Sequence, residues 1–126
     1  MHKSKLAGFI IDCQSDDLQA CGNFWSAALG MRLQELPSDE ADRYKRLVDP
    51  HLNLHMEVQT VAHPSRVHLD IETDDIEAEV ARLIRLGATR VANVHTWVVM
   101  QAPTGHRFCV VRAASPNFQA DATEWT

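Results

Sequence analysis

Residues 67–87 read VHLDIETDDIEAEVARLIRLG and contain a complete strand-to-helix unit. Apolar and polar side chains alternate from residue 67 to residue 72, which is typical of a half-buried strand. Asp74 and Glu77 then stand three residues apart, the spacing of a capping box at a helix start. Gly87 is placed to end the helix in the left-handed conformation. Between these signals lies one apolar stripe, formed by Ile76, Val80, Leu83 and Ile84.

The same order of signals occurs earlier in the chain. A short apolar strand leads to Asp16, which has Gln19 three residues further on, and Gly30 follows the next apolar stripe. Asp16 precedes Asp74 by 58 residues, and Gly30 precedes Gly87 by 57. A strand, a cap, a stripe and a terminal glycine at nearly one offset indicate an internal repeat.

The remaining patterns predict two βαβββ modules in a single α+β domain that covers residues 1–126. Module one covers residues 6–59, with strands at 6–13, 31–36, 44–48 and 52–58 and a helix at 17–29. Module two covers residues 66–112, with strands at 66–72, 90–94, 97–101 and 107–112 and a helix at 75–86. Residues 1–5 are predicted as a polar lead and 37–43 as a loop. The tail, residues 113–126, lacks periodicity, although its Phe118 and Trp125 can dock on the domain or on a second subunit.

Composition and charge indicate which kinds of molecule the protein is expected to bind and where it is expected to be located. The chain has 126 residues, 45% of them hydrophobic, and a formal net charge of −5. A nucleic-acid-binding surface needs clustered basic residues, so we expect no nucleic-acid partner. No run of 18 apolar residues is present, so we expect no membrane partner and a cytoplasmic location. Three cysteines without CxxC spacing are typical of free thiols. Common nucleotide-binding and hydrolase motifs are absent from the sequence.

Alternation along the strands predicts which polar side chains face away from the helices. His68 and Asp70 stand two residues apart on one strand and therefore share a face, a pairing that either orients the imidazole or is an ordinary hydrogen bond. Trp97 is a candidate for stacking a flat ligand. Each of these residues also fits a solvated sheet face, and Cys109 fits a small buried side chain. The candidate ligand-binding residues are His68, Asp70, His55, Glu57, Cys109 and Trp97.

Several motifs in fixed order resemble the vicinal oxygen chelate superfamily, which includes glyoxalase I, bleomycin-resistance proteins and extradiol dioxygenases. They are FWSAALGM at residues 24–31, VHLDIETDD at 67–75, RLGA at 85–88 and the P-x-G-x-x-F-C-V pattern at 103–110. The resemblance covers residues 6–112 and is closest to small bacterial glyoxalase-like domains. It implies mixed sheets that curl around a cavity, with helices on the convex side and a metal or ligand bound by the concave face.

The resemblance also implies where metal ligands would stand, in the first and last strand of each module. His68 matches the position in strand five, and Glu57 or His55 matches the one in strand four. The strand-one position falls on Gly8 or Ile10, neither of which has a ligand atom. Cys109 stands where the metal enzymes have a glutamate. We therefore predict His68 and Glu57 as the metal ligands if a divalent metal is bound, and no intact glyoxalase metal centre.

These observations support two functional hypotheses and a weaker third. The first is a glyoxalase-like protein that binds a small organic molecule in the concave sheet cavity, without a cofactor. The alternative is a divalent-metal-dependent lyase, isomerase or dioxygenase that acts on a vicinal-oxygen substrate. The third is an accessory domain that works through protein contacts. The resemblance makes a homodimer the expected assembly, and the sequence does not identify the ligand.

Overall fold

The computed structural model describes residues 1–37 and 40–126, which form two compact units. One unit comprises residues 8–67 and the other comprises residues 1–7 and 68–126. The α+β class and the two βαβββ modules predicted from the sequence are confirmed. Ser38 and Asp39 of the predicted loop lie outside the described residues.

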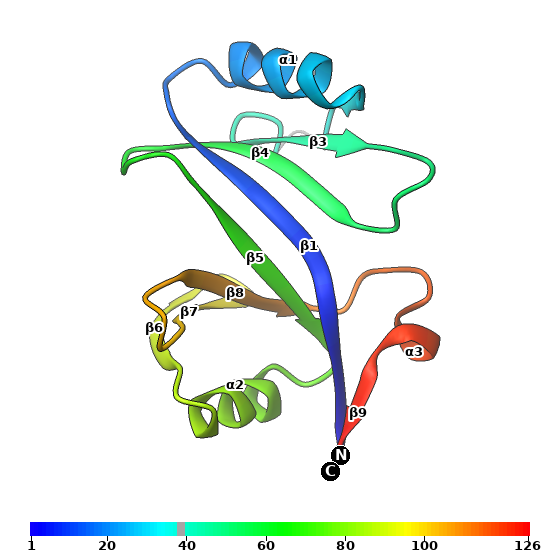
Figure 1. The fold of residues 1–126 in the computed structure, drawn as a ribbon, viewed down its shortest axis with the longest axis vertical. Coiled ribbons are helices and arrows are strands. Elements are labelled where there is room, and N and C mark those ends of the chain that lie inside the picture. The colour runs from blue at the N-terminus through cyan, green and yellow to red at the C-terminus, as the bar shows by residue number, and fades with distance from the viewer. Residues whose placement is uncertain (38–39) are drawn as a thin grey trace. The chain divides into compact units, whose positions relative to one another are not determined.

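The first module forms a mixed sheet with one helix on it (Figure 1). Its sheet order is β2-β3-β4-β1, in which β3 is antiparallel to β2 and β4 while β4 is parallel to β1. The elements are β1 (His2–Gln14), α1 (Leu18–Leu29), β2 (Arg32–Gln34), β3 (Tyr44–Val48) and β4 (His55–Val61).

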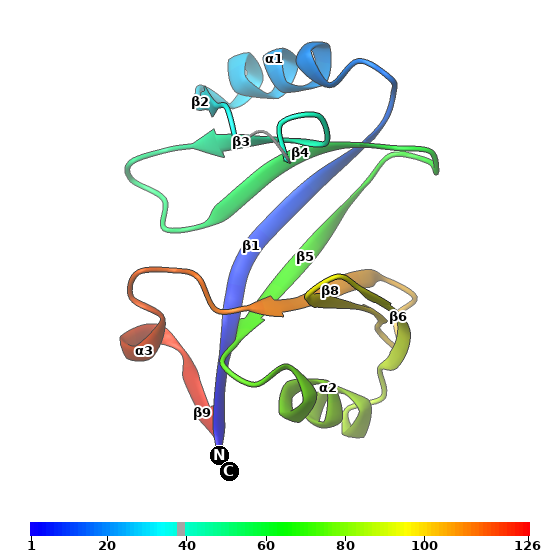
Figure 2. The ribbon, with the colours of Figure 1, turned by 180° about the vertical axis from the view of Figure 1, so that it is seen from behind.

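The second module repeats this arrangement. Its sheet order is β5-β8-β7-β6, with β5 parallel to β8 and the other neighbours antiparallel. Both ribbon views show α2 on one side of these strands (Figures 1 and 2). The elements are β5 (Arg66–Thr73), α2 (Ile76–Arg85), β6 (Thr89–Val94), β7 (Trp97–Gln101) and β8 (Arg107–Arg112).

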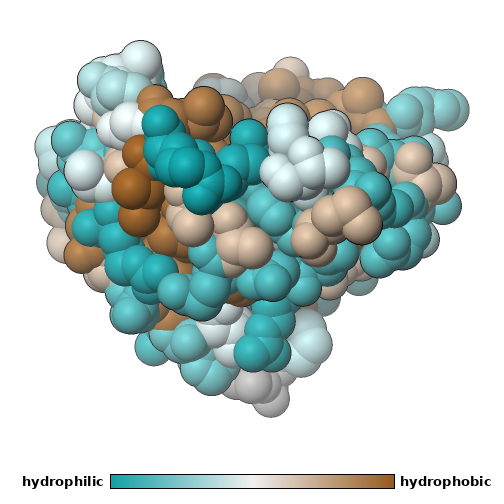
Figure 3. Space-filling model, turned by 90° about the horizontal axis from the view of Figure 1, so that it is seen from below, coloured by the Kyte–Doolittle hydropathy of each residue, from teal (hydrophilic) through white to brown (hydrophobic). Residues whose placement is uncertain are grey.

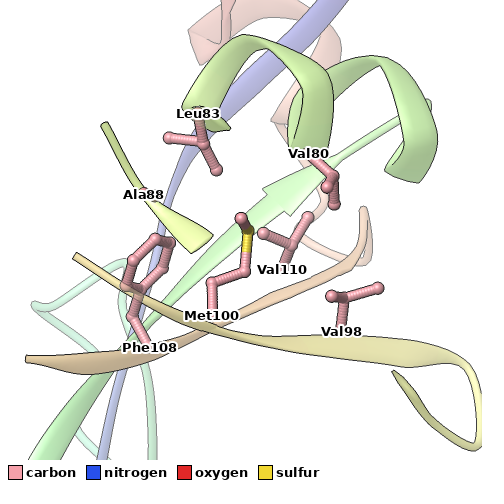
Figure 4. Close-up of a cluster of buried hydrophobic side chains, with 7 residues drawn as sticks. All are labelled: Val80, Leu83, Ala88, Val98, Met100, Phe108 and Val110. Atoms are coloured by element: carbon pink, nitrogen blue, oxygen red, sulfur yellow. The ribbon is translucent and has the colours of Figure 1, made fainter. Parts of the chain in front are cut away.

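Each helix buries an apolar stripe against its own sheet. In the second module, Val80 and Leu83 of α2 meet Met100 and Val110 of the strands, and Met100 and Val110 are fully buried (Figure 4). In the first module, Trp25 and Cys21 of α1 pack on a cluster that contains Leu47, Met56 and Val58. Burying one such side chain contributes roughly 1.5–3 kcal/mol. These two clusters fix the helix side of each sheet and hence the opposite, polar side.

The helix starts differ by one residue from the prediction. The capping side chains are Asp17, which accepts from the backbone N–H of Ala20, and Asp75, which accepts from that of Ala78, both at 3.0 Å. Asp74 instead accepts from the backbone N–H of Lys3 at 2.8 Å. Two adjacent aspartates occur at each start, so the spacing pattern could not separate the cap from its neighbour. The predicted helix ends are confirmed, since Gly30 and Gly87 have φ values of 68° and 108°.

The predictions for the two ends of the chain were wrong in part. Residues 2–5 are not a lead but the start of β1, which pairs antiparallel with β9 (Thr123–Trp125). The tail also contains the short α3 (Phe118–Asp121), whose Phe118 is only 5% exposed. Buried Glu72 holds the beginning of the tail by accepting from the Ser115 hydroxyl at 2.6 Å. The tail therefore docks on its own chain.

The helix-facing side of β5 is only partly covered. Val67 and Leu69 are 56% and 50% exposed, whereas Ile71 packs against the buried cluster. Helix α2 contacts β6, β7 and β8, which explains why the first half of β5 lacks a cover. The face shown in Figure 3 is mostly hydrophilic, with separate hydrophobic patches. In the described part of the chain, no helix combines the length and the apolar character needed to cross a membrane.

Candidate functional site

Three predicted ligand-binding residues lie together in the second module. Asp70 of β5 is the direct register partner of Cys109 of β8, and His68 stands two residues before Asp70 on the same face. One ligand atom from each of these residues, a ring nitrogen, a carboxylate oxygen and the thiol sulfur, lies within 4.8 Å of the other two. We call His68, Asp70 and Cys109 the module-two cluster. Parallel pairing of the first and last strands of the module is what brings them together.

The carboxylate of Asp70 has an unused acceptor. Its Oδ1 is buried and has no hydrogen-bond partner within residues 1–37 and 40–126. His68 Nε2 lies 3.5 Å from this oxygen, which is too long for a good hydrogen bond. A buried acceptor without a partner costs about 1–3 kcal/mol. The module-two cluster therefore carries a polar atom that a bound donor or cation would satisfy.

The other predicted residues form a second group in the first module. His55 and Glu57 of β4 are close to one another, with His55 Nε2 3.3 Å from Glu57 Oε2. Arg46 of β3 is the register partner of Glu57, and its Nε is buried without a hydrogen-bond partner in the described chain. We call His55, Glu57 and Arg46 the module-one cluster. The two predicted metal ligands, His68 and Glu57, thus belong to different units, each with its own neighbours.

Arg46 was not among the predicted site residues, although the sequence contained the signal. Tyr44, Arg46 and Val48 alternate with Lys45 and Leu47, which are buried on the helix side. The same parity that selected Glu57 would have placed Arg46 on the same side of the sheet, and the strand register in the structure pairs the two.

Trp97, the sixth predicted residue, is partly buried at the start of β7. The imidazole of His95 meets its ring edge-on, with the ring centroids 6.2 Å apart. Trp97 also lines a pocket of about 310 Å³ beside the turn that joins β6 to β7. Trp97 is therefore next to a hollow in which a ligand could be placed.

All three cysteines are free thiols. Burial raises the pKa of Cys13 to about 11, with further contributions from Cys21 and Asp12. Because the thiolate is the reactive form, Cys13 is a poor nucleophile near neutral pH. Cys13 is best explained as a small side chain packed beneath α1.

The donor atoms of the module-two cluster suit a zinc-type ion. The ligand set that the resemblance implies is incomplete in this chain. Nitrogen, carboxylate oxygen and sulfur are all ligands of zinc, and Asp70 has a free acceptor. The strand-one position does not contribute, because neither Gly8 nor Ile10 has a ligand atom in its side chain, and a Cβ on Gly8 would overlap the carbonyl oxygen of His55. The four ligands that the resemblance implies are therefore not all present, whereas His68, Asp70 and Cys109 offer three.

Comparisons with known proteins agree with this architecture. Residues 8–111 match the family described as the glyoxalase-like domain, and the chain belongs to that family. The resemblance to the vicinal oxygen chelate superfamily is thereby confirmed. No match was found among curated proteins.

Solved structures with the same fold include two methylmalonyl-CoA epimerases. The enzyme from Mycobacterium tuberculosis is 19% identical, with 91% of each chain covered and a TM-score of 0.64. A variant of the Streptomyces coelicolor enzyme in complex with 2-nitronate-propionyl-CoA is 16% identical, with 88% of this chain and 96% of that chain covered and a TM-score of 0.60. A protein of undescribed function from Bacillus halodurans is 15% identical, with coverages of 90% and 99% and a TM-score of 0.61. At these identities the likeness concerns the fold.

Proposed function

We propose that this protein binds a small polar organic molecule through the sheet face that lies away from the helices, with the module-two cluster as the main contact. The observation that carries the proposal is the buried Asp70 Oδ1 that has no partner in the described residues. A ligand hydroxyl or amine would donate to this oxygen. His68 stands beside it and can donate to or accept from the same ligand through its ring.

The module-one cluster supports binding of the same kind. Arg46 offers a buried N–H group, which suits a carboxylate, carbonyl or hydroxyl oxygen. The imidazole of His55 can donate a hydrogen bond to the ligand. The carboxylate of Glu57, when it is ionised, can accept one but cannot donate. Polar groups that converge on one face of each sheet are what fixes the orientation of a small ligand.

We expect replacement of Asp70 by valine to leave the protein as stable as the wild type or about 1 kcal/mol more stable, because the variant removes a buried acceptor that has no partner. Asp12 is the matched control, since its side chain is 1% exposed and accepts from Gln59 at 2.8 Å. Replacement of Asp12 by valine should cost about 2 kcal/mol. Urea unfolding of the three proteins measures both differences. Equal losses in the two variants would show that Asp70 serves the fold, and would contradict the proposed binding role.

A metal-dependent activity is the second candidate, and the three donors within 4.8 Å favour it. His68, Asp70 and Cys109 would hold a divalent ion, which would act as a Lewis acid toward vicinal oxygens of a substrate. Asp70 and the neutral ring of His68 would bind it directly, and Cys109 would have to lose its proton. Affinity for the ion should therefore fall as the pH is lowered.

Elemental mass spectrometry of untagged protein distinguishes the two candidates. If the metal hypothesis is correct, the wild type should contain about one equivalent of zinc or another transition metal, as expected for one site. His68→Ala and Cys109→Ser should lose it, while His106→Ala should retain it, because His106 lies on an exposed turn and bonds to Thr104. Metal far below stoichiometry in every protein, without uptake on addition, would rule out the metal candidate and leave ligand binding without a metal.

A further inference from the structure

The pocket of about 310 Å³ in the second module is separate from the module-two cluster in its lining residues. It is formed by the first turn of α2, the turn between β6 and β7, and the end of β8. Ile76 and Val98 supply apolar surface, and Asn93 and Thr96 supply polar groups. Its volume is at the lower end of the range for small-molecule sites. A ligand here would be small and would have an apolar portion.

The charges around this pocket favour an anion. Arg90 and Arg112 both line it, and Glu77 is its one acidic residue. Glu77 is already paired, since Arg90 donates to its carboxylate at 2.7 Å. The side chain of Arg112 is exposed and makes no hydrogen bond or ion pair with any residue in 1–37 or 40–126. One guanidinium therefore remains to bind an external negative group.

Two acidic residues, Asp74 and Asp75, precede Ile76 of the pocket in the sequence, and neither pairs with the side chain of Arg112. Asp74 accepts from the backbone N–H of Lys3 at 2.8 Å, and Asp75 caps α2 by accepting from that of Ala78 at 3.0 Å. Both carboxylates are thus engaged with backbone groups. The formal net charge of the chain is −5, so the attraction of an anion to this pocket has to come from the local charges of Arg112 and Arg90.

The turn at the mouth of the pocket has an unusual backbone. His95 has a φ of 49°, and in the described part of the chain it is the one residue other than glycine with a positive φ. Non-glycine residues in this conformation cost roughly 1–2 kcal/mol and cluster at functional sites. The conformation places His95 and Thr96 on the pocket wall, with the His95 ring against Trp97. A residue with a costly backbone conformation therefore lies in the wall of the pocket.

We propose that this pocket binds a small organic anion with a flat apolar body, of the class of aromatic carboxylates, and that Arg112 pairs with the carboxylate. Ile76 and Val98 would contact the apolar body, and the Thr96 hydroxyl can donate a hydrogen bond to the carboxylate. This site is independent of the proposed function of the module-two cluster. It would serve either as a second ligand site or as an effector site.

Titration of ¹⁵N-labelled protein with benzoate, followed by NMR, tests the proposal. We expect saturable shifts of the backbone amides of residues 93–98, with an affinity in the roughly millimolar range for a ligand of this size. Benzamide, which has the same shape without the charge, should bind more weakly. Shifts confined to other parts of the chain, or equal shifts with benzamide, would overturn the proposal.

Variants of Arg112 make the test specific. Arg112→Gln should weaken benzoate binding by about fivefold or more, and Arg112→Lys should restore part of the loss. Arg85→Gln is the matched control, because Arg85 is an exposed arginine in the last turn of α2 and does not line the pocket. His68→Ala should also bind benzoate like the wild type. The proposal for this pocket can therefore be refuted without bearing on the proposed function of the module-two cluster. Unchanged binding in Arg112→Gln would contradict the assignment.

Discussion

Replacing Glu79 with alanine should lower the free energy of unfolding by about 3–5 kcal/mol, the usual cost of removing one partner from a buried ion pair. Glu79 lies on α2 and is 0% exposed. His2 binds its Oε1 at 2.8 Å, and Arg82 donates to both of its oxygens, at 2.8 and 2.7 Å. Without the carboxylate, the largely buried guanidinium of Arg82 and the ring of His2 lose their acceptor. Urea unfolding monitored by tryptophan fluorescence measures the loss.

The same substitution should loosen both ends of the chain. The guanidinium of Arg82 stacks on Trp125 at 3.9 Å from the ring centroid, and Trp125 Nε1 donates to the Ser4 hydroxyl at 2.8 Å. Glu79 thus connects α2 to β1 through His2 and to β9 through Arg82. In Glu79→Ala, hydrogen exchange should become faster in β9 and in the first residues of β1.

Glu77→Ala is the matched control on the same helix. Glu77 also pairs with an arginine at 2.7 Å, but its side chain is 73% exposed. Exposed ion pairs contribute about 0–1 kcal/mol, so this variant should remain close to the wild type. If both variants lost the same small amount, the network around Glu79 would not have the stabilising role assigned to it.

The stabilisation from Glu79 should depend on pH. Burial alone would raise the pKa of this carboxyl, but hydrogen bonds from Arg82, His2 and Ser4 hold the pKa below its usual value of 4.5. A group with a lowered folded-state pKa contributes stability above the unfolded pKa, and this contribution is lost as the pH falls through the folded pKa. The difference in stability between the wild type and Glu79→Gln should therefore shrink below about pH 4.5.

Much of the fold could be predicted because strand alternation is strong in this chain. The predicted strands at 44–48, 97–101 and 107–112 have the same bounds in the structure. The pairing of β1 with β9 could not be predicted, since it joins His2 to Trp125 across nearly the whole sequence. No local sequence pattern in either segment indicates that the two segments pair. Glu79 was missed for a different reason, because a glutamate on an amphipathic helix is normally solvated.

The candidate site was predictable to the extent that parity determines it. His68 and Asp70 share a face because they are two residues apart, and Cys109 joins them once the first and last strands of the module are paired. The unpaired state of Asp70 Oδ1 could not be predicted, because it depends on the position of every neighbouring donor. The role of Gly8 was missed as well. The sequence showed only that Gly8 has no ligand atom. The structure shows that there is no space for a side chain at this position.

Gly8→Ala should destabilise the first module by about 4 kcal/mol or more, in the range reserved for severe local conflicts. Gly8 of β1 is the register partner of His55 in the parallel strand β4. A Cβ at Gly8 would overlap the carbonyl oxygen of His55 and lie 2.6 Å from its carbonyl carbon and 2.7 Å from its nitrogen. These are backbone atoms, so a rotamer change cannot relieve the conflict. The strands would have to separate, and the hydrogen bonds between β1 and β4 near Gly8 would be lost.

Thermal unfolding by circular dichroism, together with the yield of folded protein, measures this effect. Gly105→Ala is the control, because Gly105 lies on an exposed turn with a φ of 90° and nothing within 4 Å of its added Cβ. That variant bears only conformational strain, roughly 1–2 kcal/mol. Equal stability of the two variants would show that β1 and β4 can move apart at little cost. If Gly8→Ala is much less stable than Gly105→Ala, histidine or glutamine at position 8 cannot supply the strand-one metal ligand that the superfamily resemblance implies. Either residue would bring the same Cβ into the same conflict with β4.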